Sequence, residues 1–490
     1  MGRHAEAAKK QHMTNDQTRN EWTLDEVLEA TGGKLLVKGK KQRFLGISTD
    51  SRTIQPGYLF LALEGETFDG HQFIEQAVSN GGSGLIVALN KRELIKPLVP
   101  EIPVVGVFDT LHAFGDLARF WRLCHPITVV AITGSNGKTT TKEMVAAILA
   151  RFYKVLKNRG TFNNLVGVPL TLLQLDNTHQ TAVVEMGTNQ PGEIERLTAI
   201  VHPDVGMITN IQPAHLEGLG NLRSVQAAKG ALFAGMKSTA TIVVNLDDPL
   251  VTEVASSFTG RRVGFSTTGG KADIRLDRVI SMDASGSRFL LQVANEVLEI
   301  NLPVIGKHHM QNAVAAAAAA WALNLPASTI RDGLADFQAV DKRMEVHRLS
   351  GNINIIDDTY NANPGSMAAA LETLKLVSKE GRCLAVLGDM LEMGEQTGSH
   401  HQQVGRLAAN QGVDYLLAMG EQATHLLAGA AEAGMTSDRL IRARDHQEIA
   451  LQVESLLAPG DWVLVKGSRG MHMEKVVEIL IGFNQQGGKP

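Results

Sequence analysis

A glycine-rich segment at residues 133–140 (Thr-Gly-Ser-Asn-Gly-Lys-Thr-Thr) has the residue types and spacing of a phosphate-binding loop. It follows the apolar, β-rich run 128–133 and precedes a stretch of helical character that begins at Lys142. Gly134 and Gly137 allow a tight turn that points successive backbone N–H groups at phosphate oxygens. The N-terminus of the following helix adds partial positive charge. The segment therefore predicts nucleotide binding.

Two side chains of this loop are placed to act on the nucleotide directly. Lys138 is spaced to reach the β- and γ-phosphates, and the Thr139 hydroxyl is spaced to bind Mg²⁺. Position 132 is Ile132, where the complete motif has glycine, so only the shorter G-x-x-G-K-[ST] core matches. A glycine-rich turn with an exposed lysine is the structural alternative. The expected nucleotide contacts of the loop are Gly134, Ser135, Asn136, Gly137, Lys138, Thr139 and Thr140.

Three residues further along the chain are candidates for a metal site beside the phosphates. Glu185 ends the apolar run 181–185, and ligands of parallel sheets gather at the carboxyl ends of strands. His215 lies in a loop after another apolar run, and Lys229 lies in Gln-Ala-Ala-Lys-Gly. Taken alone, each also has an ordinary interpretation: a solvated strand-end glutamate, an exposed loop histidine and a solvated helix lysine.

The elements that must position these residues alternate along most of the chain. Short apolar runs separated by helical patterns are typical of a mostly parallel, doubly wound sheet. We therefore expect an α/β protein. The predicted strands are 128–133, 181–185, 205–209 and 241–245 in the central part, and 353–356, 383–387, 415–419 and 462–465 in the C-terminal part.

Three domains are expected after a short N-terminal extension. Residues 1–21 are polar, and His12-Met13 resembles a cloning junction, so this segment is interpreted as a tag or disordered N-terminus. Residues 22–110 are expected to form a small α/β domain. Residues 111–337 should form a central parallel-sheet domain that carries the phosphate loop, and residues 338–490 a Rossmann-like domain.

The composition excludes several classes of protein. The 490 residues are 44% hydrophobic and 20% charged, which excludes a disordered chain. Lys plus Arg (47) nearly balances Asp plus Glu (51), so the net charge of −4 gives no general attraction to nucleic acid. Two cysteines far apart in the sequence do not indicate a disulfide framework. No apolar stretch reaches the roughly 20 residues needed to span a membrane. A cytoplasmic protein is expected.

Four motifs together resemble those of the Mur ligase family, in family order from about residue 22 onward. They are the phosphate loop, Ala-His-Leu-Glu-Gly around His215, Ala-Ala-Lys-Gly around Lys229, and Asp-Thr-Tyr-Asn-Ala-Asn-Pro-Gly-Ser at 358–366. The resemblance implies an ATP-dependent amide ligase of peptidoglycan synthesis, in which ATP phosphorylates a carboxylate and an amine attacks the acyl phosphate. The Tyr-Asn-Ala-Asn-Pro motif favours the member that joins D-alanyl-D-alanine to UDP-N-acetylmuramoyl-tripeptide. The family resemblance also implies a monomer.

The resemblance also assigns roles around the phosphates. It implies two Mg²⁺ ions, one held by Thr139 and Glu185 and the second by His215, although imidazole is not a favoured Mg²⁺ ligand. It further implies a CO₂-derived carbamate on Lys229. Arg343 would neutralise the γ-phosphate as a bidentate donor, where the alternative is a simple linker charge. The expected catalytic residues are Lys138, His215, Lys229 and Arg343.

The remaining predicted contacts rest on the same resemblance, with Asx turns or polar turns as the structural alternative. Two further nucleotide contacts are expected, Asn312 and Asp358. Segment 387–395 is expected to border the pocket for the dipeptide. The expected dipeptide contacts are Asn361, Asn363 and Lys466. The expected contacts to the UDP-linked substrate are Ser48, Asp50, Ser51, Arg52, Thr161, Asn163 and Asn164.

Three other functions stay open at this point. A sister Mur or folylpolyglutamate-type ligase would share the nucleotide site. A nucleotide switch that hydrolyses slowly would need a guanine-reading Asn-Lys-x-Asp motif, which this sequence lacks. Its only Asn-Lys pair, Asn90-Lys91, is followed by Arg-Glu and lies outside the expected nucleotide domain. An inactive cell-wall scaffold would not need Lys138, Glu185 and Lys229, all of which are present.

Overall fold

The structure is a computed structural model that describes residues 21–65, 68–94, 102–379 and 381–486. The chain divides into two compact units. Unit 1 comprises Met1–Thr128, Tyr153–Ala182 and Ala199–His202; unit 2 comprises Val129–Phe152, Val183–Thr198 and Pro203–Pro490. The tag or disordered segment expected at residues 1–21 lies outside the described residues except for Glu21.

The described part of unit 1 contains a five-stranded sheet in the order β2-β7-β6-β5-β4. Neighbouring strands are parallel except β2, which pairs antiparallel with β7. Its elements are β1 (Trp22–Thr23), α2 (Leu24–Thr31), β2 (Lys34–Val37), β3 (Arg43–Phe44), β4 (Gly46–Ser48), β5 (Tyr58–Leu61), η1 (Gly70–Phe73), α3 (Ile74–Ser79), β6 (Gly84–Ala88), η2 (Leu89–Leu94), β7 (Val104–Val107), α4 (Thr110–Cys124), β9 (Val155–Lys157) and α6 (Gly167–Leu172).

The sheet that carries the phosphate loop has the order β16-β15-β14-β13-β12-β11-β8-β10-β9. Along this order β13, β12, β11 and β8 pair in parallel with one another. The sequence predicted β8, β11 and β12 but not β13. The elements are β8 (Thr128–Thr133), α5 (Lys138–Leu149), β10 (Thr181–Glu185), α7 (Glu193–Val201), β11 (Val205–Ile208), α8 (Leu216–Leu219), α9 (Leu222–Gly235), β12 (Thr241–Asn245), α10 (Pro249–Ala255), β13 (Arg261–Ser266), β14 (Ile274–Asp283), β15 (Gly286–Val293), β16 (Glu296–Leu302), α11 (Lys307–Ala322) and α12 (Ala327–Ala335).

An antiparallel extension, β14 to β16, was not among the predicted strands. β15 pairs antiparallel with both β14 and β16. Along β15 the side chains of Phe289, Leu291 and Val293 are buried while the intervening ones are more exposed. This period-2 pattern is that of a sheet with one solvated face, unlike the continuous apolar runs of the parallel strands.

Alanine-rich helix α11 lies close against α5, the helix that follows the phosphate loop. The alanines from Ala313 to Ala320 are buried, and their small side chains permit a close approach of the two backbones. The alanine-rich segment is therefore a closely packed helix. It also determines where Asn312, at the start of the alanine run, lies.

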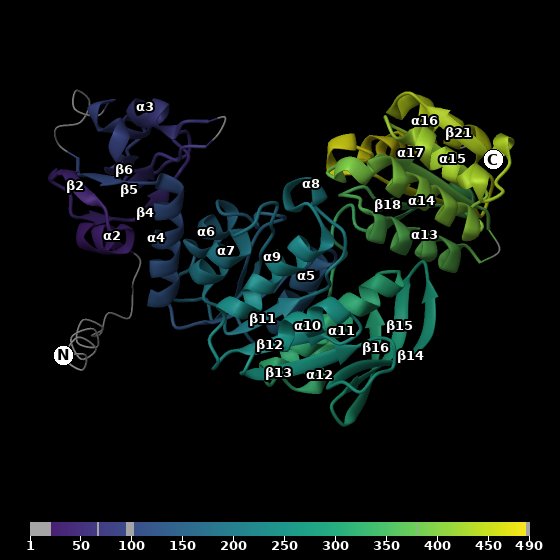
Figure 1. The fold of residues 1–490 in the computed structure, drawn as a ribbon, viewed down its shortest axis with the longest axis horizontal. Helices are drawn as coiled ribbons and strands as arrows, with labels where there is room; N and C mark the ends of the chain where they lie inside the picture. Colours follow the sequence, from purple (N-terminus) through teal and green to yellow (C-terminus); the bar gives the residue numbers. More distant parts are fainter. Residues whose placement is uncertain (1–20, 66–67, 95–101, 380, 487–490) are drawn as a thin grey trace. The chain divides into compact units, whose positions relative to one another are not determined.

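The C-terminal part of unit 2, coloured green to yellow in Figure 1, is a doubly wound sheet in the order β17-β18-β22-β19-β20-β21. One core cluster joins one face to α13, α14 and α15, and another joins the opposite face to α16 and α17. Among the described strands of this sheet, β17 alone is antiparallel to its neighbour. The elements are β17 (Glu345–Arg348), η3 (Ser350–Asn352), β18 (Asn354–Asp358), α13 (Pro364–Ser378), β19 (Cys383–Gly388), η4 (Gly394–Gln396), α14 (Thr397–Asn410), β20 (Tyr415–Met419), α15 (Ala423–Glu432), η5 (Ser437–Arg439), β21 (Leu440–Ala443), α16 (His446–Leu456), β22 (Trp462–Lys466), η6 (Arg469–Met471) and α17 (Glu474–Gln486).

The mixed α/β class with parallel sheets, expected from the sequence, is confirmed. Among the described helices, none combines the length and apolar character that crossing a membrane requires.

Candidate active site

The two glycines of the phosphate loop occupy positions that a side chain could not share. Gly134 has φ +149°, and a Cβ there would lie 1.9 Å from Thr209 Oγ1. Gly137 has φ +80°, and its Cβ would lie 2.3 Å from Asn312 Oδ1. Gly137 is also the N-cap of α5 and supplies no side-chain cap, so the first amides of the helix are available to an anion.

A neighbouring loop, which follows β11, braces the phosphate loop through hydrogen bonds. Thr209 Oγ1 donates to Asn136 O at 2.6 Å, and Asn136 N donates to Asn210 Oδ1 at 2.9 Å. Ser135 Oγ donates to Gln212 O at 2.7 Å and accepts from Gln212 N at 2.9 Å. These three bracing residues were not predicted from the sequence, although their position directly after a strand parallel to β8 was a usable signal.

Lys138 is folded over the phosphate loop. Its Nζ donates to Gly134 O at 2.8 Å and to Ser135 O at 3.2 Å. Burial lowers the pKa of Lys138; the Glu185 charge opposes this shift and the Arg343 charge adds to it. The ammonium group therefore occupies the side of the loop where phosphate oxygens are expected.

Three ionisable side chains are buried beside the loop. Glu185, at the end of β10, is 1% exposed, and Lys229 of α9 is also 1% exposed. Burial lowers the pKa of Lys229 well below its usual value, and the charge of Lys138 lowers it further. The third is Lys142, which was not among the predicted site residues; its Nζ lies 3.0 Å from Glu143 Oε1 and 3.9 Å from Glu185 Oε2. Its position one helical turn after Lys138 was the available signal.

Arg343 reaches the phosphate loop from the segment before β17. Its Nη2 donates to Thr139 Oγ1 at 3.1 Å, and its guanidinium lies over the Tyr360 ring, 4.1 Å from the centroid. The residues on either side, Lys342 and Met344, have φ of +60° and +56°. Two departures from ordinary backbone geometry thus flank the arginine, one on each side, and such strain clusters at functional sites.

The Tyr-Asn-Ala-Asn-Pro segment makes both structural and inter-element contacts. Lys466 Nζ donates to Asp358 Oδ2 at 2.6 Å and to the backbone oxygen of Asn361 at 2.8 Å. Asn363 caps α13 by accepting from Ser366 N, as the turn alternative expected. Its Nδ2 also donates to Asn136 Oδ1 at 2.7 Å, which joins this segment to the phosphate loop.

His215 pairs with a residue of segment 387–395. His215 Nδ1 lies 2.9 Å from Glu392 Oε2. The hydrogen bond from His215 is the main reason that the pKa of Glu392 is lowered. Both residues have positive φ, +54° for His215 and +62° for Glu392. With Nδ1 engaged, Nε2 of His215 is the ring nitrogen that remains for a ligand.

The residues expected to contact the UDP-linked substrate lie in unit 1 and are held by local hydrogen bonds. Arg52 forms a two-point ion pair with Asp50, at 2.9 and 2.7 Å, on an exposed turn. This bond from Arg52 lowers the pKa of Asp50 to about 2. Buried Ser51 donates to Gln76 Oε1 at 2.7 Å, and Ser48 Oγ donates to Asp50 O at 3.2 Å.

A second loop of unit 1 carries the other three predicted residues. Asn164 Oδ1 accepts from Val166 N at 3.2 Å and from Gly167 N at 2.8 Å, where α6 begins. Asn163 N donates to Thr161 O at 2.7 Å. These contacts form a polar turn, which leaves the predicted substrate roles of the two loops as predictions.

The donor set in unit 2 fits Mg²⁺. The Thr139 hydroxyl and the buried Glu185 carboxylate are oxygen ligands, which Mg²⁺ prefers. Lys138 and Glu185 interact electrostatically, so the carboxylate lies within range of the phosphate loop. His215 offers a nitrogen, which suits a harder cation less well.

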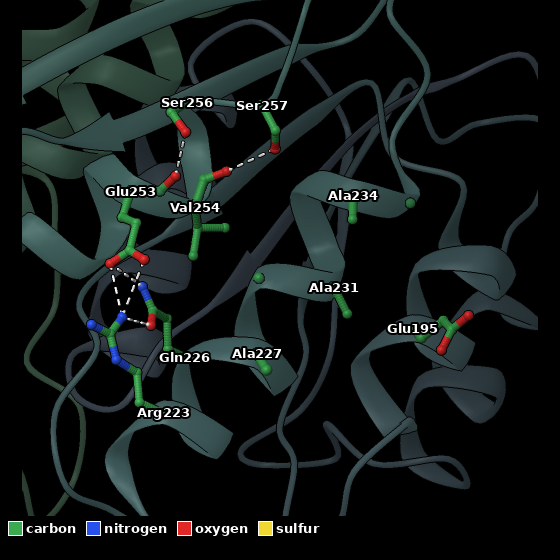
Figure 2. A pocket seen from close by; sticks show the side chains of 12 residues that line it. Glu195, Arg223, Gln226, Ala227, Ala231, Ala234, Glu253, Val254, Ser256 and Ser257 are labelled. Atoms are coloured by element: carbon green, nitrogen blue, oxygen red, sulfur yellow. Dashed lines mark hydrogen bonds and ion pairs between the residues drawn. The ribbon is translucent and has the colours of Figure 1, made fainter.

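A surface hollow of about 770 Å³ lies over α9, with α10 on one side and Glu195 of α7 on the other (Figure 2). Small side chains of α9 form its floor, and Arg223 makes an ion pair with Glu253 at its rim. None of the predicted site residues lines this hollow. The residues that form it are Glu195, Arg223, Gln226, Ala227, Gly230, Ala231, Ala234, Gly235, Glu253, Val254, Ser256 and Ser257.

Comparisons with known proteins match nearly the whole chain. Three family models match: "Mur ligase family, catalytic domain" at residues 43–122, "Mur ligase middle domain" at 132–320, and "Mur ligase, glutamate ligase domain" at 342–469. The UDP-N-acetylmuramoyl-tripeptide–D-alanyl-D-alanine ligase of Escherichia coli (strain K12) is 36% identical over 461 residues, covering 94% of this chain and 98% of that protein.

Solved structures agree with this match. A crystal structure of MurF from Acinetobacter baumannii is similar with a TM-score of 0.86 at 33% identity, covering 94% of this chain and 99% of that one. The structure of MurF ligase from Thermotoga maritima in complex with ADP has a TM-score of 0.81 at 26% identity, covering 90% and 98%.

Proposed function

The chain belongs to the Mur ligase family, and from this membership we propose that it is the ATP-dependent ligase that joins D-alanyl-D-alanine to UDP-N-acetylmuramoyl-tripeptide. The observation that carries the proposal is the 36% identity to the Escherichia coli enzyme of that name over 98% of its length. The product would be a UDP-linked pentapeptide for peptidoglycan, made with release of ADP and phosphate. A cytoplasmic location and a monomeric state are part of the proposal.

The first chemical step would be transfer of the γ-phosphoryl group of ATP to the terminal carboxylate of the tripeptide. This step brings two anions together, so catalysis depends mainly on fixed positive charge. Lys138 lies on the phosphate loop, and Arg343 reaches Thr139 at the start of α5. We assign to both the neutralisation of the β- and γ-phosphates, with Asn312 and Asp358 as further nucleotide contacts.

Thr139, Glu185 and His215 would hold Mg²⁺, which when bound supplies charge neutralisation of the phosphates. Lys229 would act as a carbamate. Because its lowered pKa favours the neutral amine, its nitrogen can form a bond to the carbon of CO₂ and lose a proton. The product is an anion in place of a buried cation, and it would support the metal site instead of repelling it.

The second step would be attack of the dipeptide amine on the acyl phosphate, which expels phosphate and forms the amide. Asn361, Asn363 and Lys466 lie together around the start of α13 and the end of β22. We assign the dipeptide to this group. The turns at residues 48–52 and 161–164 of unit 1 would bind the UDP-linked substrate through hydroxyls, amides and the exposed Arg52.

The proposal is tested by measuring phosphate release from ATP in the presence of Mg²⁺. UDP-N-acetylmuramoyl-tripeptide and D-alanyl-D-alanine are supplied separately and together. Release only with both substrates, and a UDP-pentapeptide identified by mass, is the expected result. Release with neither substrate would refute the ligase. Equal release with single amino acids in place of the dipeptide would assign the chain to another amide-forming member of the family.

A further inference from the structure

Glu345, His347 and Asp357 lie together on one face of the β17–β18 pair. Glu345 and Asp357 are directly opposite each other in the antiparallel register. His347 is two residues after Glu345, so its side chain projects from the same face of β17. Asp358, the next residue of β18, projects to the other face and pairs with Lys466. The three side chains are therefore separate from the nucleotide and dipeptide group.

The three side chains converge on one point. His347 Nε2 lies 3.9 Å from Glu345 Oε1 and 4.0 Å from Asp357 Oδ2, and one donor atom of each side chain lies within 4.8 Å of the others. The outer oxygens are held by separate donors: Asp357 Oδ1 accepts from Thr359 N and Oγ1 at 3.0 and 2.6 Å, and Glu345 Oε2 accepts from Lys342 N at 3.4 Å. The other carboxylate oxygens, Glu345 Oε1 and Asp357 Oδ2, face His347.

Asp357 is the deepest member of the group. Its side chain is 8% exposed, and no described residue donates a hydrogen bond to Oδ2. Burial is the main cause that raises the pKa of Asp357, and the Glu345 charge raises it further. Two carboxylates directly opposite on paired strands repel each other, and His347 at 3.9–4.0 Å is too far for a hydrogen bond to either.

We propose that Glu345, His347 and Asp357 form a binding site for a transition-metal dication of the Zn²⁺ class. One imidazole and two carboxylates are a donor set that Zn²⁺ accepts, and a nitrogen ligand disfavours Mg²⁺ and Ca²⁺. Ligands at about 2.0–2.2 Å from a tetrahedral ion are roughly 3.4 Å apart, so each donor must move by only about 0.5 Å. The bonds to Thr359 and Lys342 would orient the two carboxylates as outer-shell donors do.

The place of the site in the fold gives it a structural role. β17 is the edge strand of its sheet, and the arginine that reaches the phosphate loop, Arg343, lies two residues before Glu345. On the other strand, Tyr360, which supports the Arg343 guanidinium, lies three residues after Asp357. A bound metal would fasten the two strands at the point from which both residues extend.

The test is calorimetric titration of the metal-free full-length protein with Zn²⁺ in excess Mg²⁺, which occupies the phosphate-loop site. His347→Gln and Asp357→Asn remove one ligand each, and His112→Gln removes the histidine of a His–Asp pair on α4 as the control. Loss of an outer-shell partner already weakens metal affinity by about 10–100-fold. We therefore expect Zn²⁺ binding to be at least about 100-fold weaker in both ligand variants and to keep its wild-type affinity in the control.

Co²⁺ gives a second readout, because a tetrahedral site produces intense visible bands that the ligand variants should lose. His347 is partly exposed, so His347→Gln keeps the test valid even if Asp357→Asn does not fold. Unchanged Zn²⁺ affinity in His347→Gln, or absence of Zn²⁺ binding in the wild-type protein, would overturn the proposal. Displacement of Zn²⁺ from this site by the excess Mg²⁺ would overturn the assignment to the Zn²⁺ class.

Discussion

Replacing Gly137 by alanine should inactivate the nucleotide site by a steric effect that can be separated from backbone strain. The new Cβ would lie 2.3 Å from Asn312 Oδ1, whereas carbon and oxygen pack at about 3.4 Å or more, so one of the two must move by about 1 Å. Asn312 is buried on α11, and Gly137 begins α5. Relief of the contact moves either the Asn312 amide or the loop, and both are predicted nucleotide contacts.

The matched control is Gly192→Ala. Gly192 has φ +87°, close to the +80° of Gly137, but a Cβ there meets nothing within 4 Å. Each alanine should cost about 1–2 kcal/mol of backbone strain, which lowers the melting temperature by a few degrees. Only Gly137→Ala should also reduce kcat/KM, by about 100-fold, since a 1 Å misplacement costs about that much.

The assay is phosphate release at varied ATP with both substrates present, together with thermal melts followed by circular dichroism. If Gly137→Ala matched Gly192→Ala in both kcat/KM and melting temperature, the close approach of Asn312 to the loop would not constrain the site. A loss of activity in both variants would mean that backbone strain alone explains the effect.

Three further predictions concern other parts of the molecule. Lys229→Ala should lower turnover by about 100-fold or more, and a small carboxylic acid should restore part of it by replacing the carbamate; full activity in the variant would remove Lys229 from the mechanism. Glu392→Gln should lower kcat/KM by about 10-fold without a change in melting temperature, because the amide orients His215 less firmly; unchanged kinetics would show that other contacts position the imidazole. Burial opposes the ionisation of Asp69, but the bond from Lys91 helps to hold its pKa at about 2. The unfolded state therefore binds the proton first, so the free energy of unfolding should fall as the pH drops from about 4 to 2, and Asp69→Asn should flatten that part of a urea-denaturation series.

Continuous apolar runs predicted β8, β10, β11 and β12 and, in the C-terminal part, β18, β19, β20 and β22, but not the parallel strands β13 and β21. β8, β10 and β12 begin and end where their apolar runs do. Helix α5 begins at Lys138, four residues before the helical stretch that was predicted from Lys142. The strand predicted at 353–356 instead spans Asn354–Asp358, because the ladder to β22 continues through two acidic residues. The antiparallel strands β14 to β16 were missed since their alternation is weaker than a continuous apolar run.

The side-chain environment of the site depended on packing that one sequence does not specify. Lys229 has the local sequence of a solvated helix lysine, and only the packing around α9 buries it. The pairing of His215 with Glu392 joins residues 177 positions apart. Asn363 shows that two interpretations can hold together, because it caps its own helix and also contacts Asn136.

The long sequence separations at the phosphate loop have a consequence for folding. Its bracing bonds come from residues 73 to 77 positions away, and the contacts of Arg343 and Asn363 span 204 and 227 positions. Closing such long loops costs chain entropy before any contact repays it, so these bonds form late. During synthesis, the emerging chain acquires β8 and α5 long before it acquires the groups that complete the nucleotide site. The complete chain should therefore bind ATP with higher affinity than a nascent chain that ends before Arg343.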